Sequence, residues 1–278
     1  MSRTVLITGT SSGFGRASAR RFAERGWNVV ATMRRPDPAD ALAAFDNVLV
    51  TRLDVQDPNS IETAVAAGIE RFGAIDALIN NAGFGLFGVF EGTSRDKIRE
   101  QFDVNVFGVM DVTRALLPHF RRRRSGTIVN VSSGAGVFAL PMISLYTASK
   151  FALEGFSESL AYELASQNIR VRLVEPGGVV TTSFGARSAA EAAGADVPAD
   201  YAAFAAATAK VFDGLRASRL ATPEQVAEVI IAATEDTGDR LRYVATEDIA
   251  ALVRARRETS EDAYLALMRE TFAVAPNG

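Results

Sequence analysis

Short apolar segments alternate with longer helical segments along most of the chain, and this alternation constrains the fold most. The short segments are apolar almost throughout, which is typical of strands buried on both faces of a parallel sheet. Repeated strand–helix units imply right-handed crossovers and therefore a doubly wound α/β sheet. The expected strands are Val5–Ile7, Val29–Ala31, Val48–Leu53, Ala77–Ile79, Ile128–Val131, Val171–Val174 and a late strand near Leu241–Val244.

Helical periodicity fills the intervals between these strands, and no linker separates two cores. We therefore expect one Rossmann-type domain over residues 1–278, with a mostly parallel seven-stranded sheet flanked by helices. Within it, the Ala-rich segment 182–220 is expected to form a helical substrate lid; the alternative is a poorly ordered surface insertion. The expected helices are Gly15–Arg25, Asn59–Phe72, Arg95–Arg122, Ser144–Ser166 and Pro223–Thr234, followed by a helical tail from Ile249 to Phe272.

Composition excludes several classes of function. The chain has no cysteine, which rules out disulfides, thiolate metal sites and a cysteine nucleophile. The single histidine, His119, cannot build a multi-histidine metal site, so we expect no metal and a structural role for this residue. A net charge of −3 gives no basic excess for nucleic acid. The sequence lacks a signal-peptide pattern and an apolar run of roughly 20 residues, which predicts a cytoplasmic protein without membrane partners.

A glycine-rich turn follows the first predicted strand and opens a helix. Glycines permit a tight turn and let backbone N–H groups approach a pyrophosphate, while the helix N-terminus favours negative charge. The spacing is G-x-x-x-G-x-G rather than G-x-G-x-x-G, and an ordinary glycine-rich loop is the alternative. Its position on the first strand–helix turn favours a dinucleotide site made by Gly9, Ser11, Ser12, Gly13, Phe14 and Gly15.

The end of the second predicted strand bears on the choice of cofactor. NAD sites usually place an acidic residue there for the ribose hydroxyls, but the chain reads ATMRR at 31–35. The planar guanidinium of Arg34 suits a 2′-phosphate, and Ser11 or Ser12 would add a hydroxyl. The pattern favours NADP(H); the alternative is a solvated arginine pair before the turn at 36–38.

Tyr146 and Lys150 are four residues apart on a predicted helix, which places both side chains on one face. A nearby ammonium lowers the pKa of a phenol from about 10 and suits it to protonate a developing alkoxide. A surface Tyr–Lys pair is the alternative, because this spacing is common. Ser133, however, ends the fifth strand at the edge where open α/β sheets bind ligands, so Ser133 and Tyr146 are expected to converge.

Further motifs follow in a fixed order: TGTSSGFG at 8–15, LDV at 53–55, NNAG at 80–83, NVFG at 105–108, VSS at 131–133, YTASK at 146–150 and PGGVVT at 176–181. On this set the chain resembles the short-chain dehydrogenase/reductase family over roughly residues 3–183. Within the family it is similar to the branch of 17β-hydroxysteroid and retinol dehydrogenase-like enzymes and their bacterial relatives.

The resemblance implies a role for each matching residue. Tyr146 would be the general acid/base, and Lys150 would lower its pKa and hold the nicotinamide ribose. Ser133 would polarise the substrate carbonyl. Asn105 would support a water-mediated proton relay to Lys150, although a helix-interior asparagine that bonds locally is the alternative. The remaining implied cofactor contacts are Asp54 and Val55 at the adenine, Asn81, Ala82 and Gly83 near the adenosine ribose, and Pro176, Gly177, Val179 and Thr181 at the nicotinamide.

The expected function is hydride transfer between NADP(H) and a small to medium, mainly apolar ketone, aldehyde or secondary alcohol. A set of apolar residues follows strands four and five and either lines the substrate pocket or belongs to the core: Phe84, Phe87, Phe90 and Phe138, with Leu140 and Met142. The alternatives are an NAD-dependent alcohol dehydrogenase and a non-catalytic dinucleotide-sensing module, although the latter is expected to have lost the catalytic residues. The resemblance also suggests a homodimer or homotetramer built on the helices that contain Asn105 and Tyr146.

Overall fold

The computed structural model describes residues 2–37, 39–179, 188, 197–217 and 221–272. They include a seven-stranded sheet with the order β3-β2-β1-β4-β5-β6-β7, in which all neighbouring strands are parallel. The predicted sheet is therefore confirmed, and it is parallel throughout rather than mostly parallel. The strands are β1 (Thr4–Thr8), β2 (Asn28–Met33), β3 (Val48–Arg52), β4 (Ala77–Asn80), β5 (Gly126–Val131), β6 (Ile169–Glu175) and β7 (Arg242–Val244).

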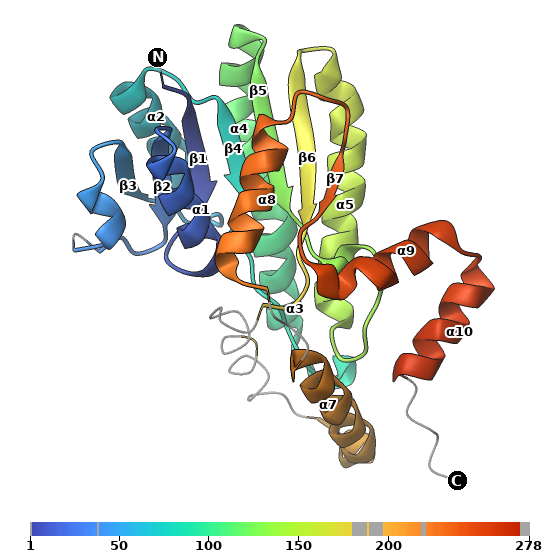
Figure 1. Cartoon of the computed structure of the whole chain (residues 1–278). Helices are drawn as coiled ribbons and strands as arrows, with labels where there is room; N and C mark the ends of the chain where they lie inside the picture. The colour runs from blue at the N-terminus through green and yellow to red at the C-terminus, as the bar shows by residue number, and fades with distance from the viewer. Residues whose placement is uncertain (1, 38, 180–187, 189–196, 218–220, 273–278) are drawn as a thin grey trace.

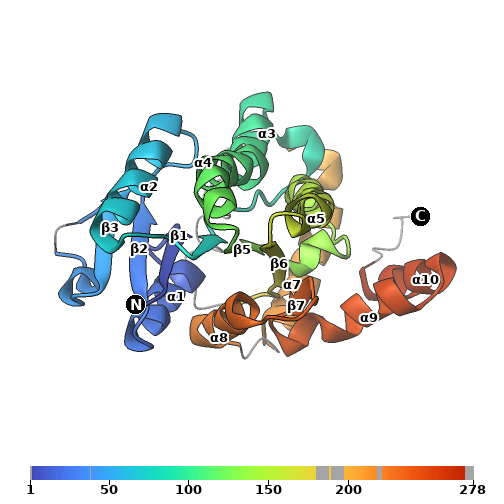
Figure 2. The same ribbon diagram turned by 90° about the horizontal axis from the view of Figure 1, so that it is seen from above.

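Helices cover both faces of the sheet, which explains why the strands are apolar throughout (Figures 1 and 2). Val5 and Ile7 of β1 face one core, and Leu6 between them faces the other. The first core is closed by α1 (Gly13–Glu24) and α8 (Pro223–Glu235). The second is closed by α2 (Pro58–Phe72), α4 (Gly108–Arg123) and α5 (Ser144–Ala165).

The helix predicted over Arg95–Arg122 is interrupted in the structure. It consists of α3 (Arg95–Phe102), a π-helical turn η3 (Asp103–Phe107) and α4. Such turns insert an extra residue into a helix and are frequent at functional sites. The turn contains Asn105, which is 1% exposed. The local periodicity of the sequence does not reveal this interruption.

The C-terminal tail is helical as predicted and forms two helices, α9 (Ala250–Glu258) and α10 (Glu261–Phe272). Thr259 between them has an extended backbone, and the Ser260 hydroxyl accepts a hydrogen bond from the Ala263 N–H at 3.3 Å. A serine in that position is a usual start for a new helix, so the break has a sequence signal that periodicity alone misses.

The described part of the expected lid segment 182–220 contains a short turn, η5 (Ala199–Tyr201), and helix α7 (Ala202–Ala217), which lies below the sheet in Figure 1. The rest of that segment, apart from Ser188, is outside the described residues. Across the described ranges, none of the helices has the length and apolar content needed to cross a membrane. His119 accepts a hydrogen bond from the Ile75 N–H at 3.1 Å, which agrees with the structural role predicted for it.

Candidate active site

The turn after β1 requires its glycines for two different reasons. Gly9 and Gly13 have φ angles of +74° and +56°, a region that side chains rarely adopt. Gly15 is needed for close packing, because a Cβ there would lie 2.3 Å from the carbonyl oxygen of Gly9. The predicted glycine-rich turn is thus present, and helix α1 begins directly within it.

The Asn81–Ala82 segment after β4 holds this turn in place. The Asn81 side chain donates from Nδ2 to the carbonyl oxygens of Thr8 at 2.9 Å and Gly9 at 3.1 Å. In return, the Thr8 hydroxyl accepts from the backbone N–H groups of Asn81 and Ala82, both at 3.0 Å. Asn81, which the family resemblance places near the ribose, uses its side-chain amide to support the glycine turn.

The N-terminus of α1 fits the pyrophosphate of a dinucleotide. Its N-cap residue Ser12 is extended, and hydrogen bonding along the helix begins with Arg16 N–H donating to Ser12 O at 3.2 Å. The N–H groups of the first turn therefore point out of the helix, where they can meet an anion. The glycines leave room for that approach, so the turn and the helix N-terminus together suit the cofactor class that the sequence predicts.

The loop after β2 determines what an adenosine ribose would meet. Arg34 and Arg35 are exposed at the end of the strand. The guanidinium of Arg16 donates two hydrogen bonds to the carboxylate of Asp40, at 2.9 and 3.1 Å. Burial raises the pKa of Asp40, but hydrogen bonds from Arg16 and the Leu42 N–H outweigh this effect and hold the pKa below its usual range. This carboxylate therefore already has two partners within the chain.

Two predicted adenine contacts follow β3. The Asp54 carboxylate accepts a hydrogen bond from the Gln56 N–H at 3.1 Å. The backbone N–H of Asp54 donates to the Ser60 hydroxyl at 3.0 Å. Val55 is 8% exposed and belongs to the core, where its side chain packs against Gly108 at the start of α4. Val55 thus contributes to packing, while Asp54 is partly accessible.

Ser133 and Tyr146 converge, as predicted. Ser133 follows β5, and its hydroxyl accepts from the Ala135 N–H at 3.1 Å and is hydrogen-bonded to the Tyr146 side chain. Burial raises the pKa of Tyr146 to about 12, and the hydrogen bond with Ser133 offsets only part of that rise. The expected lowering of this pKa is therefore wrong for the structure, because the cost of placing a phenolate in a buried site exceeds the stabilising effect of its neighbours.

Lys150 lies one helical turn beyond Tyr146, and its ammonium is buried. Its Nζ donates to the carbonyl oxygen of Val131 at 2.8 Å and lies 5.8 Å from the centroid of the Tyr146 ring. Burial lowers the pKa of Lys150 to about 8, against the opposing influence of the Glu154 carboxylate. The predicted pair is thus close in space, and both members occupy an environment that disfavours charge.

Asn105 connects the π-helical turn to the loop after β4 and to α5. Its Nδ2 donates to the carbonyl oxygen of Phe84 at 2.9 Å and to the Ser149 hydroxyl at 3.1 Å. Its Oδ1 accepts from the Phe84 N–H at 3.1 Å. The Ser149 hydroxyl in turn donates to the carbonyl oxygen of Tyr146 at 2.7 Å. Asn105 therefore reaches the tyrosine through one intermediate side chain, and the relay to Lys150 stays a prediction.

Two polar residues that sequence reasoning missed belong to the same network. Gln101 is fully buried one turn before Asn105, donates from Nε2 to Phe84 O at 2.7 Å and accepts from the Leu86 N–H at 2.8 Å. Ser149 is the other residue, through its bond with Asn105. Four-residue spacing of amide side chains at 101 and 105 is the sequence signal that indicates their common helical face.

The loop after β6 contains the predicted nicotinamide contacts. The carbonyl oxygen of Pro176 accepts from the Gly134 N–H at 2.9 Å, so this loop lies directly beside the residue that follows Ser133. Val179 is 9% exposed and packs in the core on the α1 and α8 face. Thr181 is outside the described residues.

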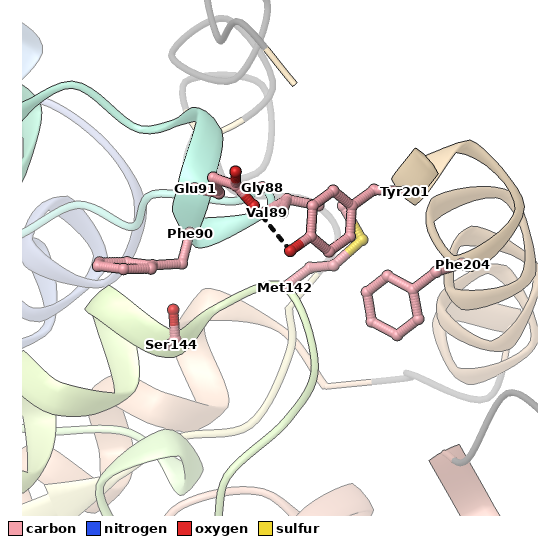
Figure 3. A pocket seen from close by; sticks show the side chains of 8 residues that line it. All are labelled: Gly88, Val89, Phe90, Glu91, Met142, Ser144, Tyr201 and Phe204. Carbon is pink, nitrogen blue, oxygen red and sulfur yellow. Dashed lines mark hydrogen bonds between the residues drawn. The ribbon is translucent and has the colours of Figure 1, made fainter. Parts of the chain in front are cut away.

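A cavity of about 470 Å³ opens between the loop after β4, the segment around the start of α5 and the η5–α7 segment (Figure 3). Phe87 precedes Gly88 of the cavity lining, and its ring packs against the group that includes Tyr146 and meets Phe212 of α7 edge-on at 6.3 Å. The Tyr201 hydroxyl donates to the Glu91 carboxylate at 2.9 Å across the opening. The lining residues are Gly88, Val89, Phe90, Glu91, Met142, Ser144, Tyr201 and Phe204.

The four phenylalanines proposed as pocket walls separate into two groups. Phe84 and Phe138 are at most 2% exposed and belong to the core. Phe90 is 60% exposed and lines the cavity, and Phe87 packs against the cluster that contains Tyr146. Of these phenylalanines, Phe90 therefore lines the cavity as predicted, whereas Phe84 and Phe138 do not.

Comparison with known proteins is consistent with this geometry. The chain matches the short chain dehydrogenase family over residues 3–192. It is 36% identical over 240 residues to an uncharacterised oxidoreductase of Schizosaccharomyces pombe, covering 86% of this chain and 98% of the relative. It is also 43% identical over 188 residues to human retinol dehydrogenase 8, covering 64% of this chain and 60% of that protein.

Solved structures agree with the sequence comparison. A short-chain dehydrogenase from Streptomyces avermitilis superposes with a TM-score of 0.81 at 34% identity, covering 97% of this chain and 95% of the other. A short chain dehydrogenase/reductase from Burkholderia phymatum in complex with NAD gives a TM-score of 0.79 at 28% identity, covering 92% and 93%. The chain therefore belongs to the short-chain dehydrogenase family and is an oxidoreductase of that family.

Proposed function

We propose that this protein is an NADP(H)-dependent enzyme that transfers a hydride between the nicotinamide and a carbonyl or secondary alcohol. The observation that carries the proposal is the buried cluster of Ser133, Tyr146 and Lys150, in which the Tyr146 side chain is hydrogen-bonded to Ser133 and lies beside the Lys150 ammonium. A phenol hydrogen-bonded to a serine and flanked by an ammonium is suited to protonate an oxygen that gains charge.

Each residue of the cluster has a distinct task in carbonyl reduction. The glycine turn and the N-terminus of α1 would hold the dinucleotide, which when bound would supply the hydride for the carbonyl carbon. The Ser133 hydroxyl holds and polarises the substrate oxygen, and the Tyr146 hydroxyl gives that oxygen its proton. The Lys150 ammonium then stabilises the phenolate that remains. Alcohol oxidation uses the same groups in reverse, with Tyr146 accepting the proton.

Preference for NADP(H) over NAD(H) is supported by the charges after β2. Arg34 is exposed there and offers a charged fork to a 2′-phosphate. The two nearest following carboxylates are occupied: Asp40 accepts from Arg16, and Asp37 accepts from the Ala39 N–H at 2.9 Å. Asp40 is thus engaged by Arg16, whereas Asp37 is exposed and lies beyond Arg34 and Arg35 in the loop. The NAD complex of the Burkholderia relative keeps NAD(H) as the alternative cofactor.

The substrate that we propose is a mainly apolar ketone, aldehyde or secondary alcohol of small to medium size. Val89, Phe90, Met142 and Phe204 supply apolar surface to the cavity, and its volume of about 470 Å³ is within the usual range for small-molecule sites. The similarity to retinol dehydrogenase 8 supports the same class.

A homodimer or homotetramer built on η3 and α5 is part of the proposal. Phe107 on η3 is 54% exposed, and Phe151 and Tyr162 on α5 are 42% and 76% exposed. Large apolar side chains on these neighbouring elements would be covered by a second copy. Size-exclusion chromatography with light scattering measures the assembly directly.

Two titrations test the function. Purified protein is titrated with NADPH and with NADH by calorimetry, and carbonyl compounds are then screened by NADPH oxidation. Tyr146→Phe should bind NADPH within about 2-fold of wild type and lose at least roughly 100-fold in kcat, since it removes only the transferable proton. If Tyr146→Phe changed neither cofactor binding nor the protein's effect on a partner, the dinucleotide-sensing alternative would be favoured. Tighter binding of NADH than of NADPH by the wild-type protein would overturn the cofactor assignment.

A further inference from the structure

The C-terminal segment holds the loop that follows β6 by two backbone contacts. The Gly177 N–H donates to the Thr246 hydroxyl at 2.8 Å, and the Gly178 N–H donates to the Asp248 carboxylate at 3.1 Å. Thr246 is the N-cap of the short turn η6 (Glu247–Ile249), which leads into α9. About 70 residues separate each pair along the chain, so only the tertiary fold brings them together.

The contacts with Thr246 and Asp248 leave no room for a side chain at position 177. A Cβ at that position would lie 2.3 Å from the Asp248 carboxylate and 2.6 Å from the Thr246 hydroxyl. The described glycines with positive φ do not include Gly177, so an unusual turn does not explain its presence. The missing side chain allows Thr246 and Asp248 to reach the backbone of the loop.

A buried ion pair anchors the same segment one residue before the loop. Glu175 is fully buried at the end of β6, and Arg257 of α9 donates to its carboxylate at 2.5 Å. Arg242 of β7 lies 3.7 Å from the same carboxylate oxygen. A buried carboxylate is strongly dependent on such partners, so α9 has a defined position relative to the start of the loop.

The loop after β6 is in turn hydrogen-bonded to the residue that follows Ser133. The Pro176 carbonyl oxygen accepts from the Gly134 N–H at 2.9 Å, and Gly134 directly follows Ser133. A continuous set of hydrogen bonds therefore runs from Thr246 and Asp248, through residues 176–178, to the serine that would hold the substrate oxygen.

We propose that Thr246 and Asp248 are positioning residues for hydride transfer, with Arg257 anchoring the segment that contains them. They hold residues 175–178, and through them they set the placement of the nicotinamide-facing loop and of Ser133. This inference rests on the proposed function. Its physical basis is that hydride transfer requires donor and acceptor atoms at about 3–3.5 Å, and that a displacement of about 1 Å can cost 100-fold in rate.

The first test compares two substitutions of one residue. Thr246→Val keeps the shape of the side chain and removes the acceptor, whereas Thr246→Ser keeps the acceptor. Thr259→Val is the matched control, because Thr259 is an exposed threonine of the same segment whose hydroxyl donates to Ala255 O. The measurements are the Kd for NADPH, kcat and KM, the melting temperature, and the primary isotope effect with NADPH deuterated at the transferred position.

We expect Thr246→Val to lower kcat about 10- to 100-fold and to raise the isotope effect, with the Kd for NADPH within about 3-fold. Thr246→Ser should recover most of the loss, and Thr259→Val should match wild type. A merely structural role would lower the melting temperature without changing the isotope effect, and that result would overturn the proposal.

Asp248→Ala provides a second variant at an exposed position, where misfolding is not expected. Its control is Glu247→Ala, which removes the neighbouring exposed carboxylate of the same turn. We expect a fall in kcat and a raised isotope effect for the first substitution only. Wild-type kinetics in Asp248→Ala and Thr246→Val would refute the inference while leaving the proposed function intact. A wild-type protein that binds neither dinucleotide would refute both.

Discussion

The Nζ atom of Lys150 lies 5.8 Å from the centroid of the Tyr146 ring, one turn further along α5, and both side chains are at most 9% exposed. Burial moves the two pKa values apart: it raises that of Tyr146 to about 12 and lowers that of Lys150 to about 8. Under the proposed function, activity at neutral pH would depend on the charged form of Lys150, whose pKa of about 8 lies only slightly above neutral pH.

This relationship predicts the pH dependence of carbonyl reduction. Below about pH 8 the Lys150 ammonium is present and stabilises the phenolate that forms on Tyr146. As the pH rises through about 8 the ammonium loses its proton, so kcat should fall along a limb with an apparent pKa near 8, a value that belongs to the interacting pair. A kcat profile between pH 6 and 10 measures it.

Glu154 should set the position of that limb. Its carboxylate favours the charged form of Lys150, so Glu154→Gln should move the limb to lower pH. Glu158→Gln is the control, because Glu158 also bonds Arg242 but is half-exposed at the side chain. Equal shifts in both variants would show that the limb reports the Arg242 contacts rather than Lys150.

Arg34→Ala should weaken the binding of NADPH about 10- to 100-fold and change the Kd for NADH by less than about 3-fold. The reason is that only the 2′-phosphate, which NADH lacks, loses a charged partner. Parallel calorimetric titrations measure both constants. Arg20→Ala is the control, since Arg20 is a highly exposed arginine on α1 that pairs with Glu24. Comparable losses for the two cofactors would contradict the assignment of Arg34 to the phosphate.

Gly15→Ala should abolish dinucleotide binding and lower the melting temperature, because the new Cβ would lie 2.3 Å from Gly9 O and 2.4 Å from Asn81 Nδ2. In Gly214→Ala the Cβ meets open space among the described residues, and the helix should gain roughly 0.5–1 kcal/mol. NADPH titration and thermal unfolding of both variants check this. Normal binding by Gly15→Ala would mean that the turn tolerates a shift of its backbone.

Asn105→Ala should lower the free energy of unfolding by about 1–3 kcal/mol, because the Phe84 N–H loses its buried acceptor. For a chain of this size that corresponds to a fall of about 2–12 °C in melting temperature. Asn59→Ala at an exposed position of α2 should change it by less than about 2 °C. If Asn105 serves only a proton relay, kcat will fall while the melting temperature stays constant.

Local features of the sequence were sufficient for the elements and for most of the candidate site. Uninterrupted apolar runs such as Val171–Val174 identify strands that are buried on both faces. The expected strands and most of the expected helices recur with small shifts at their ends, whereas the helix expected over Arg95–Arg122 is interrupted. The convergence of Ser133 and Tyr146 was predictable as well, because the carboxyl ends of parallel strands meet at one edge. The sequence by itself determined these features since they depend on residue type, period and order.

Only the tertiary structure decided the features that depend on contacts between distant residues. The π-helical turn around Asn105 accompanies side-chain bonds to Phe84, 21 residues away, which helical periodicity does not encode. The raised pKa of Tyr146 comes from burial by several elements, so the spacing to Lys150 alone predicted the wrong direction. The contacts of Thr246 with the loop after β6 likewise exist because the parallel sheet places β6 and β7 side by side, and packing rather than local sequence sets their geometry.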